Sequence, residues 1–403
     1  MISIKNKKNC TGCYACSNIC PQNCISMESD NEGFWYPKVD YDKCIKCGLC
    51  IKACPIINKI IVKNNEPNAY ACINNDEKIR LESSSGGVFT LIAEQIIDEG
   101  GVVFGAGFDD NFELIHSYSE KVEGITKFRG SKYVQSKIGD TYYKAKEFLK
   151  QGRKVLFTGT PCQIGGLKSY IGQNFDNLFC VDIVCHGVPS PKVFRRYTDY
   201  RESSAGSPTR RIAFRLKNEG WKLYSVSFLF NNDTEYRKVF NKDLYMKAFL
   251  KDVCLRPSCY ACEFKTLYRQ SDVTLADFWG IQNILPEMDD DKGTSLIFAN
   301  SDKGQSMLEN IKDKISYKKV DIKQAVKYNS AAVRSAGYNS KREQFFDDLD
   351  SIPFNQLVRK YCSDKMGVVI KRKVKLLIYK GLKETGLLRI VKSVLGRKNE
   401  NKK

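Results

Sequence analysis

The sequence predicts an α+β protein in which a small cysteine-rich N-terminal domain precedes a mixed α/β body and a basic C-terminal helix. Three observations lead to this prediction. One cysteine motif occurs twice in the first sixty residues, apolar runs with strand and helix spacing alternate from residue 69 onward, and basic residues gather in the last 39. At 403 residues with 42% hydrophobic content, the chain is long enough for two or three packed domains.

The cysteine content and the first residues bear on the compartment. Seventeen cysteines in 403 residues exceed incidental packing, yet they are too dilute for a small secreted scaffold held together by disulfides. The start, MISIKNKKNC, lacks the apolar core of a secretory signal, and no run of about 18 apolar residues that could span a bilayer is present. We therefore expect a cytoplasmic protein, in which reduced and clustered cysteines bind metal.

The first domain, expected over residues 1–62, carries the most specific motif. The pattern C-x2-C-x2-C-x3-C-P occurs twice, ending at Pro21 and at Pro55, and Gly12 and Gly48 suit the tight turns that it needs. Three closely spaced thiolates wrap one 4Fe-4S cluster, and in two-cluster ferredoxins the fourth ligand comes from the other motif. We therefore assign cluster one to Cys10, Cys13, Cys16 and Cys54, and cluster two to Cys44, Cys47, Cys50 and Cys20.

Zinc and disulfides are the competing interpretations of these eight cysteines. Zinc sites usually use two C-x2-C pairs with a longer spacer between them, so the observed spacing fits iron–sulfur better. Over residues 1–62 the chain resembles a bacterial dicluster ferredoxin. A ferredoxin fused to a larger body implies that something in the body accepts or supplies its electrons.

The body begins with a predicted strand, helix and strand in residues 63–150. Polar residues 63–69 form the expected linker, and residues 69–73 form a short strand. Residues 83–87, SSSGG, precede a helix over residues 88–98 that we expect to be capped by serine, followed by a strand over residues 102–106. Small residues at a helix start present backbone amides to a phosphate, so the candidate cofactor contacts here are Ser84, Ser85, Gly86 and Gly87.

A second turn of this kind opens the other part of the body, residues 151–345. A buried strand over residues 154–157 leads into TGTPCQ, with a helix beginning near Pro161, because proline is favoured at the first helical position. Thr160 then caps the helix, and Cys162 lies in the first turn, where the helix dipole lowers the pKa of a thiol. The candidate cofactor contacts are Gly159, Thr160, Pro161 and Cys162, and the alternative is an ordinary buried cysteine at a helix start. A further strand over residues 178–184 ends in Cys185 and His186.

A third cysteine group follows in the pattern C-x4-C-x2-C. Its members are Cys254, Cys259 and Cys262. Three thiols need a fourth ligand, for which Cys185 is the best candidate and Cys162 and Cys180 are weaker ones. We expect a third 4Fe-4S cluster here, with a zinc site or free thiols as the alternatives.

Few other residues stand out as candidates for chemistry. His116 and His186 are the only histidines. His116 lies in a strand-like stretch and is expected to be structural, whereas His186, next to Cys185, could tune a cluster or move a proton. Arg129 and Lys132 lie in the loop FRGSKYVQS as candidate anion contacts, and Asp277 follows a predicted strand, either facing a ligand or capping a turn.

The net charge of +19 is concentrated at the C-terminal end. Residues 365–403 hold 13 Lys and Arg against 2 Asp and Glu, which leaves +8 for the rest of the chain. Within residues 346–403 apolar residues recur at helical spacing among the lysines, which predicts a basic amphipathic helix. It either packs on the body or attaches to an acidic partner or to the cytoplasmic face of a membrane. Nucleic acid is not expected, because no aromatic stacking pattern or recognition motif accompanies the charge.

The order of motifs after the first domain resembles one family. SSSGGVFT, RGSKYVQS, GTPCQIGGL, CHGVPSP, CLRPSCYACEFK and SDVTLADFWG are similar to the coenzyme F(420) hydrogenase/dehydrogenase beta-subunit family, from about residue 10 to residue 345. The resemblance implies a flavin-binding body with FAD near the SSGG and GTPCQ turns, and an additional cluster held by the downstream cysteines. In that family the acceptor is a deazaflavin or a tetrapyrrole side chain.

These observations predict an iron–sulfur flavoprotein oxidoreductase. Electrons from a redox partner protein or reduced ferredoxin pass through 4Fe-4S clusters and FAD to a two-electron small-molecule acceptor, deazaflavin-like or from a polysaccharide pathway. Cys162 and His186 are the candidate catalytic residues, and Lys132 is a further candidate cofactor contact. One alternative is a non-catalytic electron-transfer subunit that serves a separate partner enzyme, and another is an assembly factor whose clusters are structural.

Overall fold

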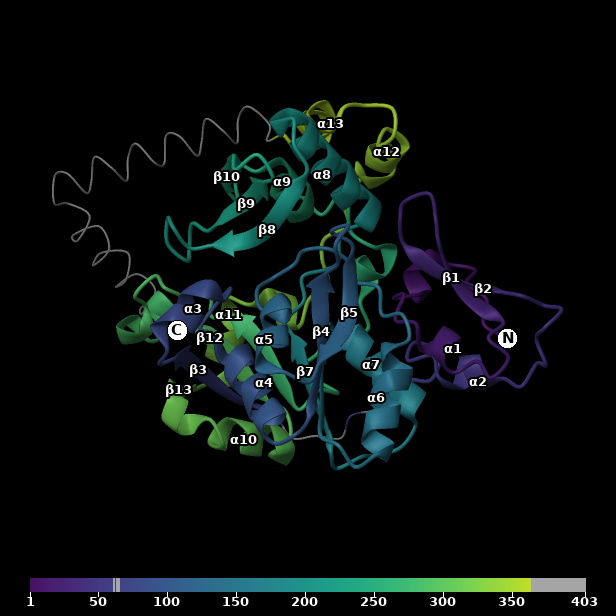
Figure 1. The fold of residues 1–403 in the computed structure, drawn as a ribbon, viewed down its shortest axis with the longest axis horizontal. Helices are drawn as coiled ribbons and strands as arrows, with labels where there is room; N and C mark the ends of the chain where they lie inside the picture. The colour runs from purple at the N-terminus through teal and green to yellow at the C-terminus, as the bar shows by residue number, and fades with distance from the viewer. Residues whose placement is uncertain (61, 63–65, 364–403) are drawn as a thin grey trace, which may run out of the picture.

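A computed structural model describes residues 1–60, 62 and 66–363, and Figure 1 shows three parts along this chain. The first is the N-terminal domain, in which the hairpin β1 (Ile25–Ser29) and β2 (Trp35–Val39) accompanies two short helices, α1 (Ala15–Asn18) and α2 (Leu49–Lys52). The hairpin is antiparallel, with Ile25 opposite Val39. Each short helix begins one residue before the third cysteine of its motif, so a cysteine loop leads into each helix.

The second part is an eight-stranded mixed sheet in the order β13-β3-β12-β11-β7-β6-β4-β5. Its four central strands β11, β7, β6 and β4 run parallel to one another, and the strands on both sides are antiparallel. The strand bounds are β3 (Asn68–Asn74), β4 (Val102–Phe108), β5 (Leu114–Ser119), β6 (Val155–Gly159), β7 (Leu178–Ile183), β11 (Val273–Asp277), β12 (Ser295–Ala299) and β13 (Ile315–Val320). The boundary expected at residues 150 and 151 therefore falls within one sheet, since β4 pairs with β6.

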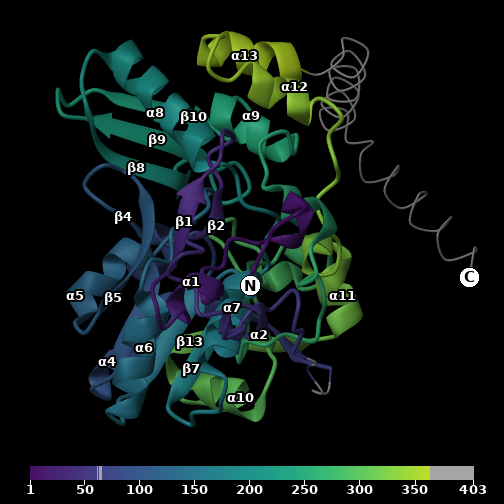
Figure 2. The ribbon, with the colours of Figure 1, turned by 90° about the vertical axis from the view of Figure 1, so that its right-hand side faces the viewer.

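Alternating side chains of the central strands fill two apolar layers. Val102 and Phe104 of β4 pack with α6 (Thr141–Lys150) and α7 (Pro161–Ile171), whereas Val103 between them packs with α4 (Val88–Asp98) and α10 (Asp302–Glu309) on the other face. This alternation follows from the two-residue period of a strand. The N-terminal domain lies outside α6 and α7, and its residues Tyr14 and Ala15 join the same apolar layer (Figures 1 and 2).

The third part is a three-stranded antiparallel sheet in the order β10-β9-β8, which lies above the large sheet in Figure 1. Its strands are β8 (Thr209–Leu216), β9 (Ser225–Phe230) and β10 (Glu235–Val239). An aromatic cluster joins them to α8 (Pro191–Ala205), α9 (Leu244–Leu250) and α13 (Phe354–Cys362). Within the described residues, the other α-helices are α3 (Glu77–Glu82), α5 (Val122–Ile125), α11 (Ile322–Lys327) and α12 (Arg342–Asp347).

The structure confirms the mixed α/β architecture and two of the predicted helices, and it corrects one cap. α7 begins at Pro161 with Thr160 as its N-cap, and Gln163 Oε1 accepts a hydrogen bond from the Thr160 amide at 2.9 Å. α4 spans Val88–Asp98 as predicted, but its N-cap is Gly87 in the left-handed region, φ 84°, without a side-chain cap. The expected serine cap is therefore wrong. The basic C-terminal helix lies outside the described residues, apart from α13 at the start of the last expected domain.

Candidate functional site

Three predicted motifs follow three neighbouring parallel strands of the large sheet. The GTPCQ turn follows β6, Cys185 and His186 follow β7, and Trp279 lies two residues after the end of β11. Because the carboxyl ends of parallel strands meet at one edge of a sheet, the motifs come together there. A cavity of about 650 Å³ occupies this edge, between the large sheet and the three-stranded sheet. Its volume lies in the range of cofactor sites.

Most of the predicted cofactor contacts line this cavity. They are Ser84, Ser85, Gly87, Lys132, Gly159 and Thr160, together with Cys185 and His186 from the cysteine-group and catalytic predictions. Gly86, Pro161 and Cys162 are not among the lining residues. Aromatic side chains line it as well, among them Tyr133 and Trp279 from the quoted motifs and Tyr224 and Phe249, which the sequence analysis did not single out. The cavity thus has both small-residue turns and aromatic rings in its wall.

The SSGG turn is held by the first residue of β12 and by the residue before it. The amide of Gly86 donates to Ser295 Oγ at 2.9 Å, and Ser85 Oγ donates to the carbonyl of Thr294 at 2.9 Å. A Cβ at Gly86 would lie 2.4 Å from the carbonyl oxygen of Cys72, so only glycine fits this approach. The Gly86 amide, expected to be free for a phosphate, is therefore already engaged, and Ser84 and Gly87 remain on the cavity wall.

Lys132 is a cationic side chain on the cavity wall. Its Nζ donates to the carbonyls of Arg129 at 3.0 Å and Gly130 at 3.2 Å. Burial lowers the pKa of Lys132 to about 7, because the charged ammonium loses water and gains only neutral acceptors. Arg129 instead pairs with Glu82 at 2.5 Å, so of the two predicted anion contacts Lys132 is the one without a carboxylate partner among the described residues.

His116 lines the cavity, although the sequence analysis expected it to be structural. Its ring stacks on Phe157, and Nε2 lies 3.0 Å from the carbonyl oxygen of Thr158. Since a carbonyl only accepts, Nε2 carries the proton and donates it. Burial lowers the pKa of His116 to about 4, so the imidazole is neutral at physiological pH. Nothing in the sequence signalled that this histidine lies in the cavity wall, because its place there depends on the neighbouring GTPCQ turn.

His186 and Asp277 each have a carboxylate or arginine partner. His186 Nε2 lies 2.6 Å from Asp252 Oδ1, and its ring meets Phe249 edge-on in the cavity wall. Asp277 accepts two hydrogen bonds from the buried Arg215, at 2.8 and 3.0 Å, and a third from the indole of Trp221 at 3.0 Å. Asp277 therefore positions the aromatic wall and is not free for a ligand.

Four cysteines from distant parts of the sequence gather beside the cavity. They are Cys162 at the start of α7, Cys185 after β7, and Cys259 and Cys262 around the turn Pro257–Ala261. Burial raises the pKa of Cys162 well above its ordinary value, and the negative charges of Cys262, Cys185 and Cys259 raise it further. Burial likewise raises the pKa of Cys259 to about 12, with Cys185 and Cys262 adding to the effect. The expected lowering of the Cys162 pKa by the helix dipole is therefore wrong, because burial and like charges outweigh it.

The surroundings of these four sulfurs suit an anionic cluster. The amide of Val188 donates to Cys259 Sγ at 3.4 Å, and Thr160 Oγ1 lies 3.2 Å from Cys162 Sγ. Lys265 donates to the carbonyl of Cys185, and its charge favours the Cys185 thiolate. Amide donors and nearby cations are typical of iron–sulfur sites. Among the described residues, no three His, Cys, Asp or Glu side chains are placed to hold a single metal ion.

Cys254 lies apart from this group. Its side chain is fully buried in the aromatic cluster of the three-stranded sheet, and Cys362 is the charged neighbour that raises its pKa most, after burial itself. Arg342 and Asp252 are the next charged groups that affect the pKa of Cys254. The structure thus brings together three of the four cysteines predicted for the third site, and it adds Cys162 in the place of Cys254.

The N-terminal cysteines lie in two sets, and the predicted cross-ligation would join the members of each set. After burial, the pKa of Cys16 is raised mainly by Cys13, Cys10 and Cys54. The other set lines a single small cavity and consists of Cys20, Cys44, Cys47 and Cys50, with Cys24 beside them. Cys24 Sγ lies 3.3 Å from Cys20 Sγ. Residues 10–20, which we call the inner loop, face the body, whereas residues 44–54, the outer loop, carry the exposed Cys47.

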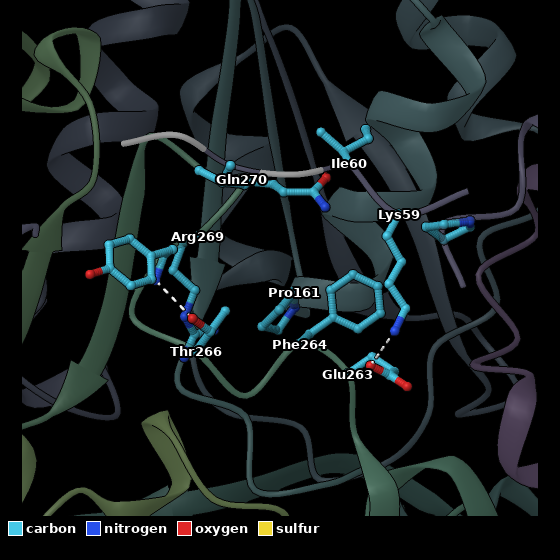
Figure 3. A pocket seen from close by; sticks show the side chains of 11 residues that line it. Lys59, Ile60, Pro161, Glu263, Phe264, Thr266, Arg269 and Gln270 are labelled. Atoms are coloured by element: carbon cyan, nitrogen blue, oxygen red, sulfur yellow. Dashed lines mark hydrogen bonds and ion pairs between the residues drawn. The ribbon is translucent and has the colours of Figure 1, made fainter. Parts of the chain in front are cut away.

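Helix α7 connects the inner loop with the third cysteine group. A Cβ at Gly166 would lie 2.9 Å from Cys13 Cβ and 3.0 Å from its Sγ, so Cys13 packs directly on the helix. Gly166 lies one helical turn after Cys162. Figure 3 shows the other side of this junction, where Pro161 and Phe264 lie between Lys59 and Arg269, and Lys59 pairs with Glu263 at 2.8 Å.

Comparisons with known proteins agree with these two cysteine-bearing regions. Residues 152–325 match the family described as the C terminus of the beta subunit of coenzyme F420 hydrogenase/dehydrogenase. Residues 9–57 match the 4Fe-4S dicluster domain. These two matches cover the N-terminal cysteine motifs and the part of the body that carries the third cysteine group. The resemblance predicted from the motifs is confirmed over these ranges, as a 4Fe-4S dicluster domain followed by a region similar to this beta subunit.

Individual relatives match parts of the chain. The coenzyme F420-dependent sulfite reductase of Methanocaldococcus jannaschii is 28% identical over 171 residues, which are 40% of this chain and 24% of that protein. NADH-quinone oxidoreductase subunit I of Pelobacter propionicus is 39% identical over 57 residues, 12% of this chain and 31% of that protein. The chain therefore spans about a quarter to a third of the length of these relatives.

One solved structure is similar at low identity. A chain of the F420-reducing [NiFe] hydrogenase complex from Methanosarcina barkeri aligns with a TM-score of 0.44 and 16% identity, over 68% of this chain and 92% of that chain.

In the described part of the protein, we find no helix with the length and apolar content to cross a bilayer.

Proposed function

We propose that the chain is a flavin-dependent iron–sulfur oxidoreductase. In this proposal electrons enter at the N-terminal 4Fe-4S clusters, reach a third 4Fe-4S cluster, and pass by way of FAD to a two-electron organic acceptor. The proposal depends on one observation: four cysteines from distant parts of the sequence meet beside a cavity of about 650 Å³ that is lined by the phosphate-suited turns. The acceptor is a deazaflavin-like molecule or a substrate of a polysaccharide pathway.

The proposed ligands of the third cluster are Cys162, Cys185, Cys259 and Cys262. Burial and neighbouring thiolates raise the pKa of Cys162, Cys185 and Cys259, so these thiols do not ionise together without a compensating positive charge. An iron–sulfur core supplies this charge, and the amide of Val188 with the cations Lys265 and Arg269 would stabilise the thiolates around it.

The residues proposed to hold FAD are Ser84, Gly87, Lys132, Gly159 and Thr160. Bound flavin supplies the ability to take electrons singly and to release them as a pair. Lys132 can hold or release a proton near neutral pH, because its pKa is lowered to about 7 by burial. His186, oriented by Asp252, lies in the cavity wall between Cys185 and Phe249 and is proposed to move a proton to or from the acceptor.

The outer loop is the proposed contact for the electron donor. Cys47 is exposed, and the nearby Tyr41 and Ile45 are 63% and 61% exposed. The inner loop is covered by α7 and the body, so a donor protein such as reduced ferredoxin reaches cluster two more closely than cluster one. In this arrangement the order of transfer is cluster two, cluster one, third cluster.

Anaerobic purification with cofactor extraction tests the proposal. The wild-type chain is expected to carry FAD, identified by mass spectrometry, and about 12 irons, four for each cluster. Cys262→Ser should lower the iron content to about eight per chain. Cys254→Ser is the matched control in the same segment and should retain about 12. Iron without any flavin, or equal iron loss in both variants, would contradict the proposal.

A second function is an electron-transfer subunit that serves a separate partner enzyme. The observation that favours it is the match to a subunit of a larger oxidoreductase. Turnover of a small acceptor separates the two functions, because the isolated chain with reduced ferredoxin should reduce a deazaflavin only if it is itself the enzyme.

A further inference from the structure

Arg256 is a fully buried guanidinium between the inner loop and the body. Its side chain is 0% exposed and lies in the segment that carries Cys259. Nε donates to the carbonyl of Cys10 at 2.9 Å, Nη2 to the carbonyl of Trp35 at 2.9 Å, and Nη1 to Gln135 Oε1 at 3.1 Å. Nη2 also lies 3.6 Å from Cys10 Sγ, and the guanidinium is 4.3 Å from the centre of the Tyr36 ring.

The oxygen partners of Arg256 are all neutral. Within the described ranges of the chain, no carboxylate lies within ion-pair distance of this guanidinium. Five other arginines are buried, and four of them contact a carboxylate: Arg80, Arg215, Arg269 and Arg342. The fifth, Arg201, stacks on the rings of Tyr200 and Tyr236. A buried charge without a counter-charge is strongly unfavourable. The position of Arg256 therefore calls for a nearby anion.

The sulfurs on the two sides of Arg256 can supply that anion. Cys10 Sγ contacts it directly, and its charge favours the thiolate of Cys259 on the other side. Four thiolates carry more negative charge than an iron–sulfur core can balance, so a bound cluster is an anion overall. Gly12 leaves the space for this contact, since a Cβ there would lie 2.9 Å from Arg256 Nη1.

We propose that Arg256 is the counter-charge of cluster one and raises its reduction potential above that of cluster two. The inference rests on the proposed assignment of Cys10 to cluster one. When an electron moves from cluster two to cluster one, the receiving core gains one negative charge, no bond is formed or broken, and Arg256 stays protonated. The positive charge and the Nη2 hydrogen stabilise this added charge more than they stabilise the oxidised core. The cation beside Cys47 in the outer loop is the exposed Lys46, whose charge water and salt screen, so electrons collect at the inner cluster, next to α7.

The test is a redox titration of the anaerobically purified full chain, followed by the EPR signals of the reduced clusters. Arg256→Gln should lower the midpoint potential of one N-terminal cluster and leave the other unchanged. We expect about a tenfold change in its reduced fraction at equilibrium, which is about 59 mV for a one-electron centre. Arg256→Lys, which keeps the charge, should show a smaller shift.

Two further variants keep the test decisive if Arg256→Gln fails to load iron. Gln135→Glu leaves the arginine in place and puts a carboxylate on its Nη1, so it should lower the same potential. Lys59→Gln removes a positive charge at the exposed edge of the same junction and should leave both potentials unchanged. Unchanged potentials in Arg256→Gln or in Gln135→Glu, with full iron content, would overturn the inference. Failure of the proposed function shows differently, as missing flavin or missing third-cluster iron in the wild-type chain.

Discussion

The inner and outer loops of the N-terminal domain have one cysteine spacing and two different surroundings. Both loops place a residue in the left-handed region just before their second cysteine and another just after it. In the inner loop these are Gly12 and Tyr14, with φ 67° and 65°, and in the outer loop they are Lys46 and Gly48, with φ 57° and 78°. Both loops therefore require a positive φ at the same two positions. The choice of glycine, tyrosine or lysine at each position follows from the side chains that surround it.

The surroundings of these positions differ between the two loops. Gly12 is pressed against Gln135 and Arg256, whereas Lys46 is exposed at the corresponding position. Tyr14 is buried in the apolar layer below α7, while nothing lies within 4 Å of a Cβ built at Gly48. The two loops thus share one backbone conformation but differ in exposure, because the body covers the inner loop and leaves the outer loop open to solvent.

The largest expected difference between the loops is in oxidative damage. During brief treatment with ferricyanide, cluster two should lose iron on the order of tenfold faster than cluster one, because Cys47 is exposed. Alkylation of the released thiols and peptide mapping measure this order. Cys20 should be labelled together with Cys44, Cys47 and Cys50, and Cys54 should stay protected with the inner set. Equal labelling of the two sets would remove the distinction between the loops.

The next largest effect is expected at the buried ion pair that holds the N-terminal hairpin to the body. Arg342 donates to Glu32 at 2.8 and 2.5 Å, and both side chains are largely buried. Glu32→Gln leaves the arginine charge unpaired, which should cost about 3–5 kcal/mol of unfolding free energy. Anaerobic urea unfolding measures it. Glu28→Gln is the matched control, because Glu28 lies on the same hairpin in an exposed pair with Lys38 and should change stability little.

A graded series at the left-handed positions gives intermediate effects. Gly48→Ala should cost about 1–2 kcal/mol, because an L-residue is strained at its φ but meets no neighbour. Gly12→Ala adds contacts of 2.8 and 2.9 Å with Gln135 and Arg256, which should cost about 1–3 kcal/mol more. Lys46→Ala adds neither backbone strain nor a new contact of a Cβ, so it should leave the stability nearly unchanged. Thermal unfolding should show the largest loss for Gly12→Ala and the smallest for Lys46→Ala, and equal losses at Gly12 and Gly48 would contradict the account.

The smallest effect is expected at the exposed ion pair of the same junction. Lys59 and Glu263 are 57% and 49% exposed at their side chains. Lys59→Gln should therefore cost about 0.2–1 kcal/mol at low salt and less in high salt, where the exposed charges are screened. Unfolding midpoints at two ionic strengths measure the difference. A loss as large as that of Glu32→Gln would show that this edge is not as open as its exposure indicates.

Local patterns predicted the elements that depend on near neighbours in the sequence. The two cluster motifs, the start of α7 at Pro161 and the span of α4 follow from spacing and from the preferences of proline at a helix start. The serine cap of α4 failed because Ser84 and Ser85 hydrogen-bond to Ser131 and to Thr294, far away in the sequence. Helix-cap preferences are read from the local sequence and do not consider such distant partners.

The candidate site depended more on topology than on spacing. Cys254 fits the C-x4-C-x2-C pattern, yet only the fold shows that it packs toward Cys362, while Cys162 reaches the group from the start of α7. Arg256 also gave no signal by itself, although a charged residue inside a cysteine-rich segment is a pattern that sequence reasoning could use. His116 was undervalued because its place beside the GTPCQ turn comes from the pairing of β4 with β5 and β6.

The position of β3 also has a consequence for how the chain is made on the ribosome. Among the strands of the described residues, β3 pairs with β12 and β13, whose residues follow it by about 220 positions or more. At a synthesis rate of about 5–20 residues per second, its apolar side chains wait roughly 10–45 s for their partners. The N-terminal domain is complete before that interval begins, so cluster insertion can precede the closing of the large sheet. A holdase that covers β3 during this time should raise the yield of folded chain.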